Sequence, residues 1–167
     1  NEAPVLANCP VAVTAYSTPT TCGHLYTFPI VQSLDNCDSD TESDHRTYLL
    51  EAGNPIWQEV TGEADHALAP GLHQLKEIHR DDSGNEVSCA WSVTVIDTIA
   101  PTIVTPSNIT GNSSTGACGA NVTFNVAFAD NCALNTTTIS NASGSFFPVG
   151  TTTVTTAATD INGRNAT

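Results

Sequence analysis

Apolar and polar residues alternate in several short segments, and this alternation is the clearest pattern in the sequence. Residues 122–128 read V-T-F-N-V-A-F, residues 89–95 read C-A-W-S-V-T-V, and residues 26–30 read Y-T-F-P-I. A period of two is typical of a strand that buries one face. No segment shows convincing spacing for an amphipathic helix. Short strands separated by Gly, Pro, Asn and Asp residues predict an all-β chain, specifically an antiparallel β-sandwich.

The two halves of the chain contain the same landmarks in the same order, which indicates an internal repeat. Each half has an Ala-Pro pair, a Cys-Gly pair, an Asp-Asn-Cys triplet, and a Gly-to-Asp segment that is followed by another Gly. These landmarks lie at 3–4, 22–23, 35–37 and 71–84 in the first half, and at 100–101, 118–119, 130–132 and 150–163 in the second. We therefore expect two tandem domains that share one fold.

The composition changes sharply at Asp97. All but two of the 17 acidic residues and all five His lie in residues 1–97, whereas residues 98–167 are rich in Thr, Ser and Asn. Such a shift close to Pro101 is typical of a domain boundary. The predicted domains are residues 1–97 and residues 98–167.

The charge argues against two classes of partner. The formal net charge is −13, whereas nucleic acids and anionic membranes both require basic surfaces. No stretch approaches the ~20 apolar residues that span a bilayer. A basic-then-apolar signal peptide is also missing, so we interpret the sequence as a mature or excised segment. Six Cys without any Met are typical of an extracellular protein.

The sequence contains no recognisable catalytic constellation. It has no Gly-x-Ser-x-Gly elbow, no P-loop and no His-Glu-x-x-His motif. His73 and His79 share one strand face with Leu75, which predicts burial rather than acid–base chemistry. We expect a non-enzymatic protein with no catalytic residues and no organic cofactor.

Several short motifs resemble the hyalin repeat (HYR) module, an extracellular immunoglobulin-like β-sandwich. In the second domain they are Pro106-Ser107-Asn108-Ile109, Asp130-Asn131-Cys132, Phe147-Pro148-Val149-Gly150 and Ala158-Thr159-Asp160-Ile161-Asn162-Gly163. In the first they are Asn8-Cys9-Pro10, Asp35-Asn36-Cys37, Asp81-Asp82-Ser83-Gly84-Asn85 and the strand from Cys89 to Val95. The resemblance implies a structural or adhesive segment of a cell-surface or filament-forming protein, with neighbouring copies or repeats as partners.

The first domain departs from the family pattern by an acidic insertion at about residues 38–66, which we expect to contain a longer hairpin. Trp57 lies in this insertion, and Tyr16 and Tyr48 are the other candidates for an aromatic strip. A strip of this kind would suit surface glycans as partners. The alternative function is therefore a carbohydrate-binding accessory module of a secreted enzyme.

The internal repeat predicts how the six cysteines pair. Cys22 and Cys37 recur as Cys118 and Cys132, so each of these pairs should form a disulfide within its own domain. Cys9 and Cys89 remain, and their disulfide would tie the first strand of domain one to its last. A zinc site is the rival hypothesis, but no Cys-x-x-Cys pair is present.

Three acidic residues, Asp97, Asp130 and Asp160, fall at predicted loop or linker positions. Oxygen-rich loops at one end of a sandwich suit calcium, which takes 6–8 oxygen ligands, so a calcium ion at these residues is one hypothesis. The other, which we favour, is that each Asp accepts hydrogen bonds from the backbone of its own turn.

Asn-x-Ser/Thr sequons are confined to the second domain and predict a glycoprotein. The candidate sites are Asn108, Asn112, Asn121, Asn135, Asn141 and Asn165. The alternative is an Asn/Thr-rich β surface that contains the pattern without glycans.

The second domain has no counterpart to the strand of residues 87–95. Its matching turn, Asp160 to Asn165, is followed only by Ala166 and Thr167. We therefore expect an open sheet edge and an apolar groove lined by residues such as Val122 and Phe124. A strand from a neighbouring copy, or from residues beyond this segment, would complete the sheet.

Overall fold

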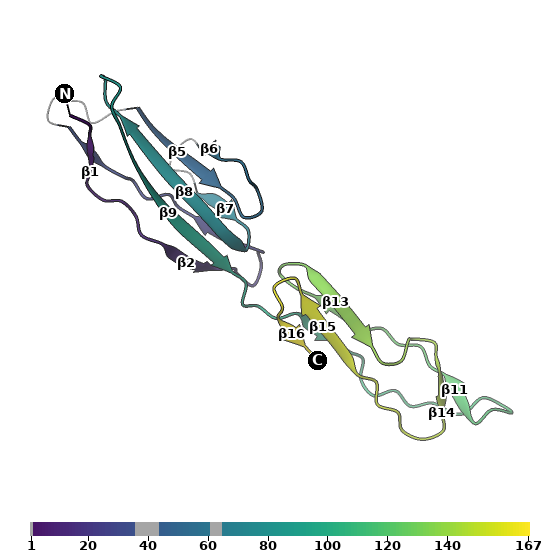
Figure 1. Cartoon of the computed structure of the whole chain (residues 1–167). Helices are drawn as coiled ribbons and strands as arrows, with labels where there is room; N and C mark the ends of the chain where they lie inside the picture. The colour runs from purple at the N-terminus through teal and green to yellow at the C-terminus, as the bar shows by residue number, and fades with distance from the viewer. Residues whose placement is uncertain (1, 36–43, 61–64) are drawn as a thin grey trace. The chain divides into compact units, whose positions relative to one another are not determined.

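The chain is all-β, as the sequence predicts. The computed structural model describes residues 2–35, 44–60 and 65–167, and these residues contain strands and no helix (Figure 1). The chain divides into two compact units, Asn1–Asp97 (unit 1) and Thr98–Thr167 (unit 2).

Unit 1 is built around a five-stranded sheet with the order β2-β9-β8-β5-β6. Its strands are β2 (Val13–Tyr16), β5 (Asp44–Leu50), β6 (Gln58–Val60), β8 (Gly71–Arg80) and β9 (Glu86–Ile96). The β8–β9 pair is the longest, running from Gly71 opposite Val95 to Arg80 opposite Glu86. The hairpin expected in the insertion is present, because β5 and β6 pair antiparallel.

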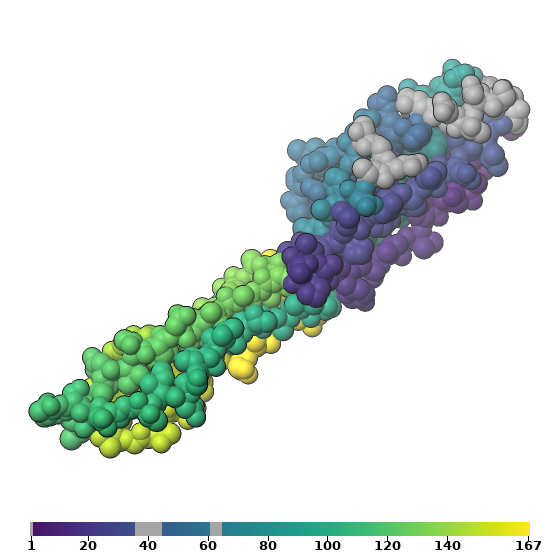
Figure 2. Space-filling model, turned by 180° about the vertical axis from the view of Figure 1, so that it is seen from behind, coloured from purple at the N-terminus to yellow at the C-terminus, as the bar shows by residue number. Residues whose placement is uncertain are grey.

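Two short strand pairs form the other layer of unit 1. β1 (Val5–Leu6) pairs with β4 (Ser33–Leu34), and β3 (His24–Tyr26) pairs with β7 (His66–Leu68). Seen from behind, the N-terminal residues of the chain, drawn in purple, run along one side of unit 1 (Figure 2). The five-stranded sheet is therefore covered on one face.

One part of the fold prediction is wrong, because the main sheet is not purely antiparallel. β2 runs parallel to β9, with Val13 opposite Val93 and Tyr16 opposite Ile96. Antiparallel neighbours are usually joined by a tight turn that reverses the chain. No turn links β2 to β9, since most of unit 1 lies between them, so the alternation pattern does not fix their relative direction.

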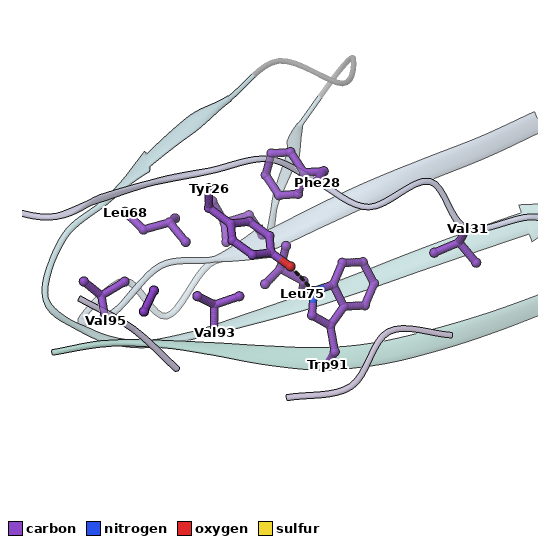
Figure 3. Close-up of a cluster of buried hydrophobic side chains, with 10 residues drawn as sticks. Tyr26, Phe28, Val31, Leu68, Leu75, Trp91, Val93 and Val95 are labelled. Atoms are coloured by element: carbon purple, nitrogen blue, oxygen red, sulfur yellow. Dashed lines mark hydrogen bonds between the residues drawn. The ribbon is translucent and has the colours of Figure 1, made fainter. Parts of the chain in front are cut away.

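The core of unit 1 lies between its two layers (Figure 3). Leu49, Leu75 and Val93 of the main sheet are completely buried, and Leu68 of β7 is 1% exposed. Trp91 donates a hydrogen bond from its indole Nε1 to the hydroxyl of Tyr26, 3.1 Å away. Aromatic side chains provide the largest buried surfaces of such a core.

The predicted alternation is correct along β9 and ends early after Tyr26. Trp91, Val93 and Val95 are all buried. After β3, Phe28 is buried, but Ile30 is 61% exposed and Val31 is buried in its place. Pro29 cannot donate a ladder hydrogen bond. Residues 27–32 lie in no strand, so the strict alternation is not kept there and the buried position moves by one residue.

Unit 2 has shorter strands. β10 (Thr102–Val104) pairs with β12 (Ala127–Ala129), and β11 (Gly119–Asn121) pairs with β14 (Phe146–Pro148). β13 (Leu134–Ile139), β15 (Thr156–Asp160) and β16 (Asn165–Ala166) form a sheet with β15 in the middle. The single strand predicted across residues 122–128 is therefore wrong, since its end belongs to β12 and residues 122–126 lie in no strand.

The apolar side chains of unit 2 are only half covered. Within residues 98–167, all of which the structure describes, Ala158 and Pro101 are the only buried apolar side chains. Val122, Phe124 and Phe147 are half-buried, and the Phe124 and Phe147 rings meet edge to face at 6.5 Å. The buried cluster of the chain lies in unit 1.

Candidate functional site

The same acidic turn is built twice, once in each unit. Asp81 follows β8, and its Oδ1 accepts hydrogen bonds from the backbone N–H groups of Ser83 (2.9 Å) and Asn85 (2.7 Å). Asp160 ends β15, and its Oδ1 accepts from the N–H groups of Asn162 and Arg164, both at 2.8 Å. These carboxylates hold the turn after the strand, which is the turn role that we favoured for Asp160.

The environment of Asp81 favours its ionised form. Asn85 donates from its side-chain amide to Asp81 Oδ2 at 2.7 Å. This bond, together with the backbone donors of Asn85, Ser83 and Gly84, lowers the pKa of Asp81 below its ordinary value of 3.8 in spite of burial. Hydrogen bonds to the charged form of an acid have this effect.

Two carboxylate oxygens of unit 2 are buried without a hydrogen-bond partner among the described residues: Asp130 Oδ1 and Asp160 Oδ2. Asp160 is 1% exposed, and Asp130 uses its other oxygen to accept from the N–H of Cys132 at 2.9 Å. Both residues lie at the same end of the β13–β15 pair, where Ile161 N–H donates to the carbonyl of Ala133. A buried oxygen that lacks a donor is costly, and a hard cation would satisfy it.

The third predicted calcium ligand is buried in unit 1. Asp97 is 2% exposed and accepts a hydrogen bond of 2.5 Å from the hydroxyl of Ser17. This bond fixes the end of β9 to the residue that follows β2.

The cysteines depart from the predicted pairing. Cys118 is a free, exposed thiol, so the structure does not form the predicted Cys118–Cys132 bridge. Cys22 and Cys132 are each disulfide-bonded, and Cys37 lies outside the described residues. Cys118 directly precedes β11 and is exposed, as are residues 111–117 before it.

Cys9 and Cys89 are free thiols in the structure, yet they lie in contact. Burial comes first among the causes that raise the pKa of Cys89 to about 12, followed by its hydrogen bond with Cys9 and the nearby Glu77. The predicted Cys9–Cys89 bridge stays a prediction, and the contact brings the two sulfur atoms together for it.

The two histidines of β8 are buried, as predicted. His73 is 1% exposed, and its Nδ1 accepts from the N–H of Ala52 while its Nε2 lies 2.7 Å from the carbonyl of Ala69. Such an arrangement fits a neutral ring that donates from Nε2. His73 therefore ties loops to the sheet.

His79 lies beside a buried acid that the sequence analysis missed. Its Nε2 is 2.8 Å from Glu77 Oε1, and both side chains are 5% exposed. His79 Nδ1 lies 3.1 Å from the hydroxyl of Ser33, and the ring stacks on His45. Period-two spacing from Leu75 places Glu77 on the core face, and that signal was available.

Two of the three aromatic candidates gather on the outer face of the main sheet. The ammonium nitrogen of Lys76 lies 5.6 Å from the ring centre of Tyr48 and 5.7 Å from that of Trp57. Tyr16 is 55% exposed on β2, which is separated from β5 and β6 by β9 and β8. The three rings do not form one strip.

The sequon asparagines of unit 2 face solvent with one exception. Asn108, Asn112, Asn121, Asn135 and Asn165 are exposed, whereas Asn141 is half-buried. The five exposed side chains are accessible to solvent.

Comparison with known proteins identifies the second unit most clearly. Residues 96–167 match the HYR domain family. The chain is also 36% identical over 152 residues to Hyalin of Strongylocentrotus purpuratus; the match covers 83% of this chain and 13% of that protein. No solved structure matches the chain. Among the described residues, no helix is long and apolar enough to cross a membrane.

Proposed function

Residues 96–167 are an HYR domain, and on this basis we propose that the chain is a non-enzymatic, adhesion-type segment of an extracellular protein. In this proposal, residues 1–97 and 98–167 are tandem immunoglobulin-like sandwich modules, and the partners are neighbouring repeats or copies. The acidic turns of Asp81 and Asp160 support the assignment of unit 1 to the same kind of module. In both units, the turn that follows the middle strand of the sheet is held by the same hydrogen bonds from backbone N–H groups to an Asp carboxylate.

Adhesion can be measured with beads coated with the chain. We expect the beads to cluster with one another or to bind cells, while beads coated with reduced, unfolded chain stay dispersed. Dispersed beads in the presence and absence of Ca²⁺, together with no cell binding, would contradict the adhesive role.

The side of β15 that the short strand β16 covers only in part supports assembly by strand addition. In unit 1, β9 pairs with the whole of β8 and fills the core with Trp91, Val93 and Val95. In unit 2, β16 pairs with β15 only at Ala158–Ala166 and Thr159–Asn165, and nearby apolar side chains are half-buried. An extended strand with an apolar residue at every second position fits this edge.

A peptide with the sequence of residues 86–96 tests the strand addition. We expect it to bind unit 2 and to raise its melting temperature, whereas a peptide of the same composition in scrambled order should do neither. Equal effects of the two peptides would contradict the proposal, since only the first keeps the alternation.

The orphaned oxygens of Asp130 and Asp160 support a calcium site in unit 2. Added Ca²⁺ should raise the melting temperature of unit 2 and Asp130→Asn should abolish the increase, with the exposed Asp82→Asn of unit 1 as control. An unchanged melting temperature after calcium addition and after chelation would contradict this site.

The exposed sequons support N-glycosylation of unit 2. Chain purified from its native source should lose mass on treatment with a peptide N-glycosidase, with the modified positions among the five exposed asparagines. An unchanged mass would show that none of the sites carries an N-glycan.

A further inference from the structure

Tyr48, Trp57 and Lys76 form a mixed aromatic and cationic group on the outer face of the main sheet of unit 1. Along β8, His73, Leu75, Glu77 and His79 are buried, so Lys76 points away from the core. Lys76 is directly opposite Tyr48 in the β8–β5 register. Trp57 immediately precedes β6, the next strand in the sheet.

Lys76 carries a positive charge that forms no ion pair with any acid in the described part of the chain. Its ammonium lies near the Tyr48 and Trp57 ring centres, at 5.6 and 5.7 Å. Among the described residues, no carboxylate forms an ion pair with it, whereas Arg46 and Arg80 pair with Glu59 and Glu86. A cation that is flanked by rings is partly desolvated and remains able to bind an anion.

The position of this charge is unusual in so acidic a chain. The chain has four Lys and Arg residues against 17 Asp and Glu, and Arg46, Lys76 and Arg80 all belong to β5 and β8. Repulsion by the net charge of −13 is screened with a Debye length of about 8 Å in physiological salt. A short-range contact with an anionic group is therefore possible at Lys76 and would be selective for this face.

The rings of Trp57 and Tyr48 indicate which other chemical feature the ligand has besides an anionic group. Trp57 is 39% exposed and Tyr48 is half-buried, and both are rigid, amphipathic surfaces of the kind that carry binding energy at low entropic cost. The flat apolar face of a pyranose ring stacks on such a surface.

We propose that Tyr48, Trp57 and Lys76 form a binding site for an anionic saccharide. One sugar ring stacks on Trp57, and its carboxylate or sulfate binds the ammonium of Lys76. This site is independent of the strand-addition edge and of the calcium site, and it gives the adhesive segment a ligand other than its own copies.

Titration calorimetry with three probes tests the site: oligogalacturonate, a heparin fragment, and a neutral galactan oligosaccharide of matched length. We expect at least one anionic probe to bind more tightly than the galactan, and its affinity to fall as salt is added. Tighter binding of oligogalacturonate would indicate that the site prefers a carboxylate, and tighter binding of the heparin fragment would indicate that it prefers a sulfate. Failure of both to bind would overturn the proposal.

The variants separate charge from stacking. Lys76→Gln should lower the affinity for the anionic probe by about tenfold, which corresponds to the loss of one charge-assisted contact. It should leave the affinity for the galactan unchanged. Trp57→Ala should lower the affinity for every probe that binds the parent chain. Tyr16→Ala removes an exposed aromatic elsewhere on the sheet, and Arg164→Gln removes a cation of unit 2, so both should bind like the parent chain.

Two results would contradict the site even if a saccharide binds. The first is unchanged affinity in both Lys76→Gln and Trp57→Ala, with melting temperatures that show folded protein. The second is tighter binding of a peptide of residues 38–44, which is acidic, because the face would then receive another copy of the chain. Trp57→Phe, which keeps a ring, should retain most of the affinity and excludes a simple loss of fold.

Discussion

Trp91 and Tyr26 link the two layers of unit 1 by a hydrogen bond in the core, 3.1 Å from indole Nε1 to the phenolic oxygen (Figure 3). The residues are 65 positions apart in the sequence. Trp91 belongs to β9, and Tyr26 ends β3 in the opposite layer. Their contact therefore reports whether the layers are correctly packed.

Tyr26→Phe should destabilise unit 1 by about 1 kcal/mol, because a buried indole N–H is left without an acceptor. Trp91→Ala should cost about 3–5 kcal/mol through the cavity it creates. Urea unfolding followed by fluorescence gives both values. A double-mutant cycle with Trp91→Phe should yield a coupling of about 0.5–1.5 kcal/mol, and additive effects would show that the bond contributes nothing.

The acidic turn after β8 should make unit 1 sensitive to acid. The pKa of Asp81 is lowered in the folded state, so its stabilising effect is complete above the unfolded value near 3.8 and is lost as the pH falls through the folded value. Asp81→Asn should lower the melting temperature at pH 7. It should also make the melting temperature fall less steeply as the pH drops below about 4. Asp82→Asn, at the exposed neighbour, should keep the steep decline. Parallel curves for the parent chain and Asp81→Asn would contradict this account.

The thiols should differ strongly in reactivity once the protein is reduced. Burial and the contact with Cys9 raise the pKa of Cys89 to about 12, which leaves almost no thiolate at pH 8, whereas Cys118 is exposed. Iodoacetamide should modify Cys118 faster than Cys89 by roughly tenfold or more. Mass spectrometry of timed samples measures the two rates, and similar rates would contradict the burial of Cys89.

Under oxidising conditions we expect Cys9 and Cys89 to form a disulfide, because their sulfur atoms are already in contact. Non-reducing peptide mapping should recover the peptide that joins them. The bridge should raise the stability of unit 1 by about 2–4 kcal/mol through its effect on the unfolded chain. Recovery of Cys9 with any other cysteine would show that the contact does not guide pairing.

Gly119 should not tolerate a side chain. A Cβ at this position would overlap the carbonyl oxygen of Phe147 and meet Cζ of Phe146 at 2.6 Å. Gly119→Ala should therefore separate β11 from β14 and destabilise unit 2 by about 1–3 kcal/mol. Gly111→Ala is the matched control, because a Cβ there meets nothing within 4 Å. Equal stabilities of the two variants would show that the β11–β14 contact is looser than described.

The sequence predicts strands well where a single long strand has the same neighbours throughout. Trp91, Val93 and Val95 follow the period-two pattern because β9 pairs with β8 over its whole length. The pattern of residues 122–128 is equally regular, yet it spans a loop and the start of β12, because each of these parts is held by a different partner. The alternation of apolar and polar residues indicates which side chains are buried, whereas the hydrogen-bonded neighbours of a segment determine whether it forms a strand.

The candidate sites were predictable only in part, for a similar reason. The turn role of Asp160 follows from local spacing, so the sequence is sufficient to propose it. The position of Lys76 beside Tyr48 depends on the register of β5 against β8. The position of Trp57 depends on where β6, the strand that follows it, pairs with β5. The burial of Glu77 beside His79 is hidden by the usual preference of Glu for solvent, although its spacing from Leu75 places it inside.

The parallel pairing of β2 with β9 has a mechanical consequence. β2 lies near the start of unit 1, and β9 leads out of the unit towards Thr98. While Cys9 and Cys89 are free thiols, a tension along the chain pulls these two parallel strands in opposite directions along their common axis. The pairs from Val13–Val93 to Tyr16–Ile96 are then sheared together instead of opening one after another. The rate of forced unfolding is set by the unfolding barrier, and this arrangement places several hydrogen bonds in that barrier at once. Unit 1 is thereby built to bear a load along its length.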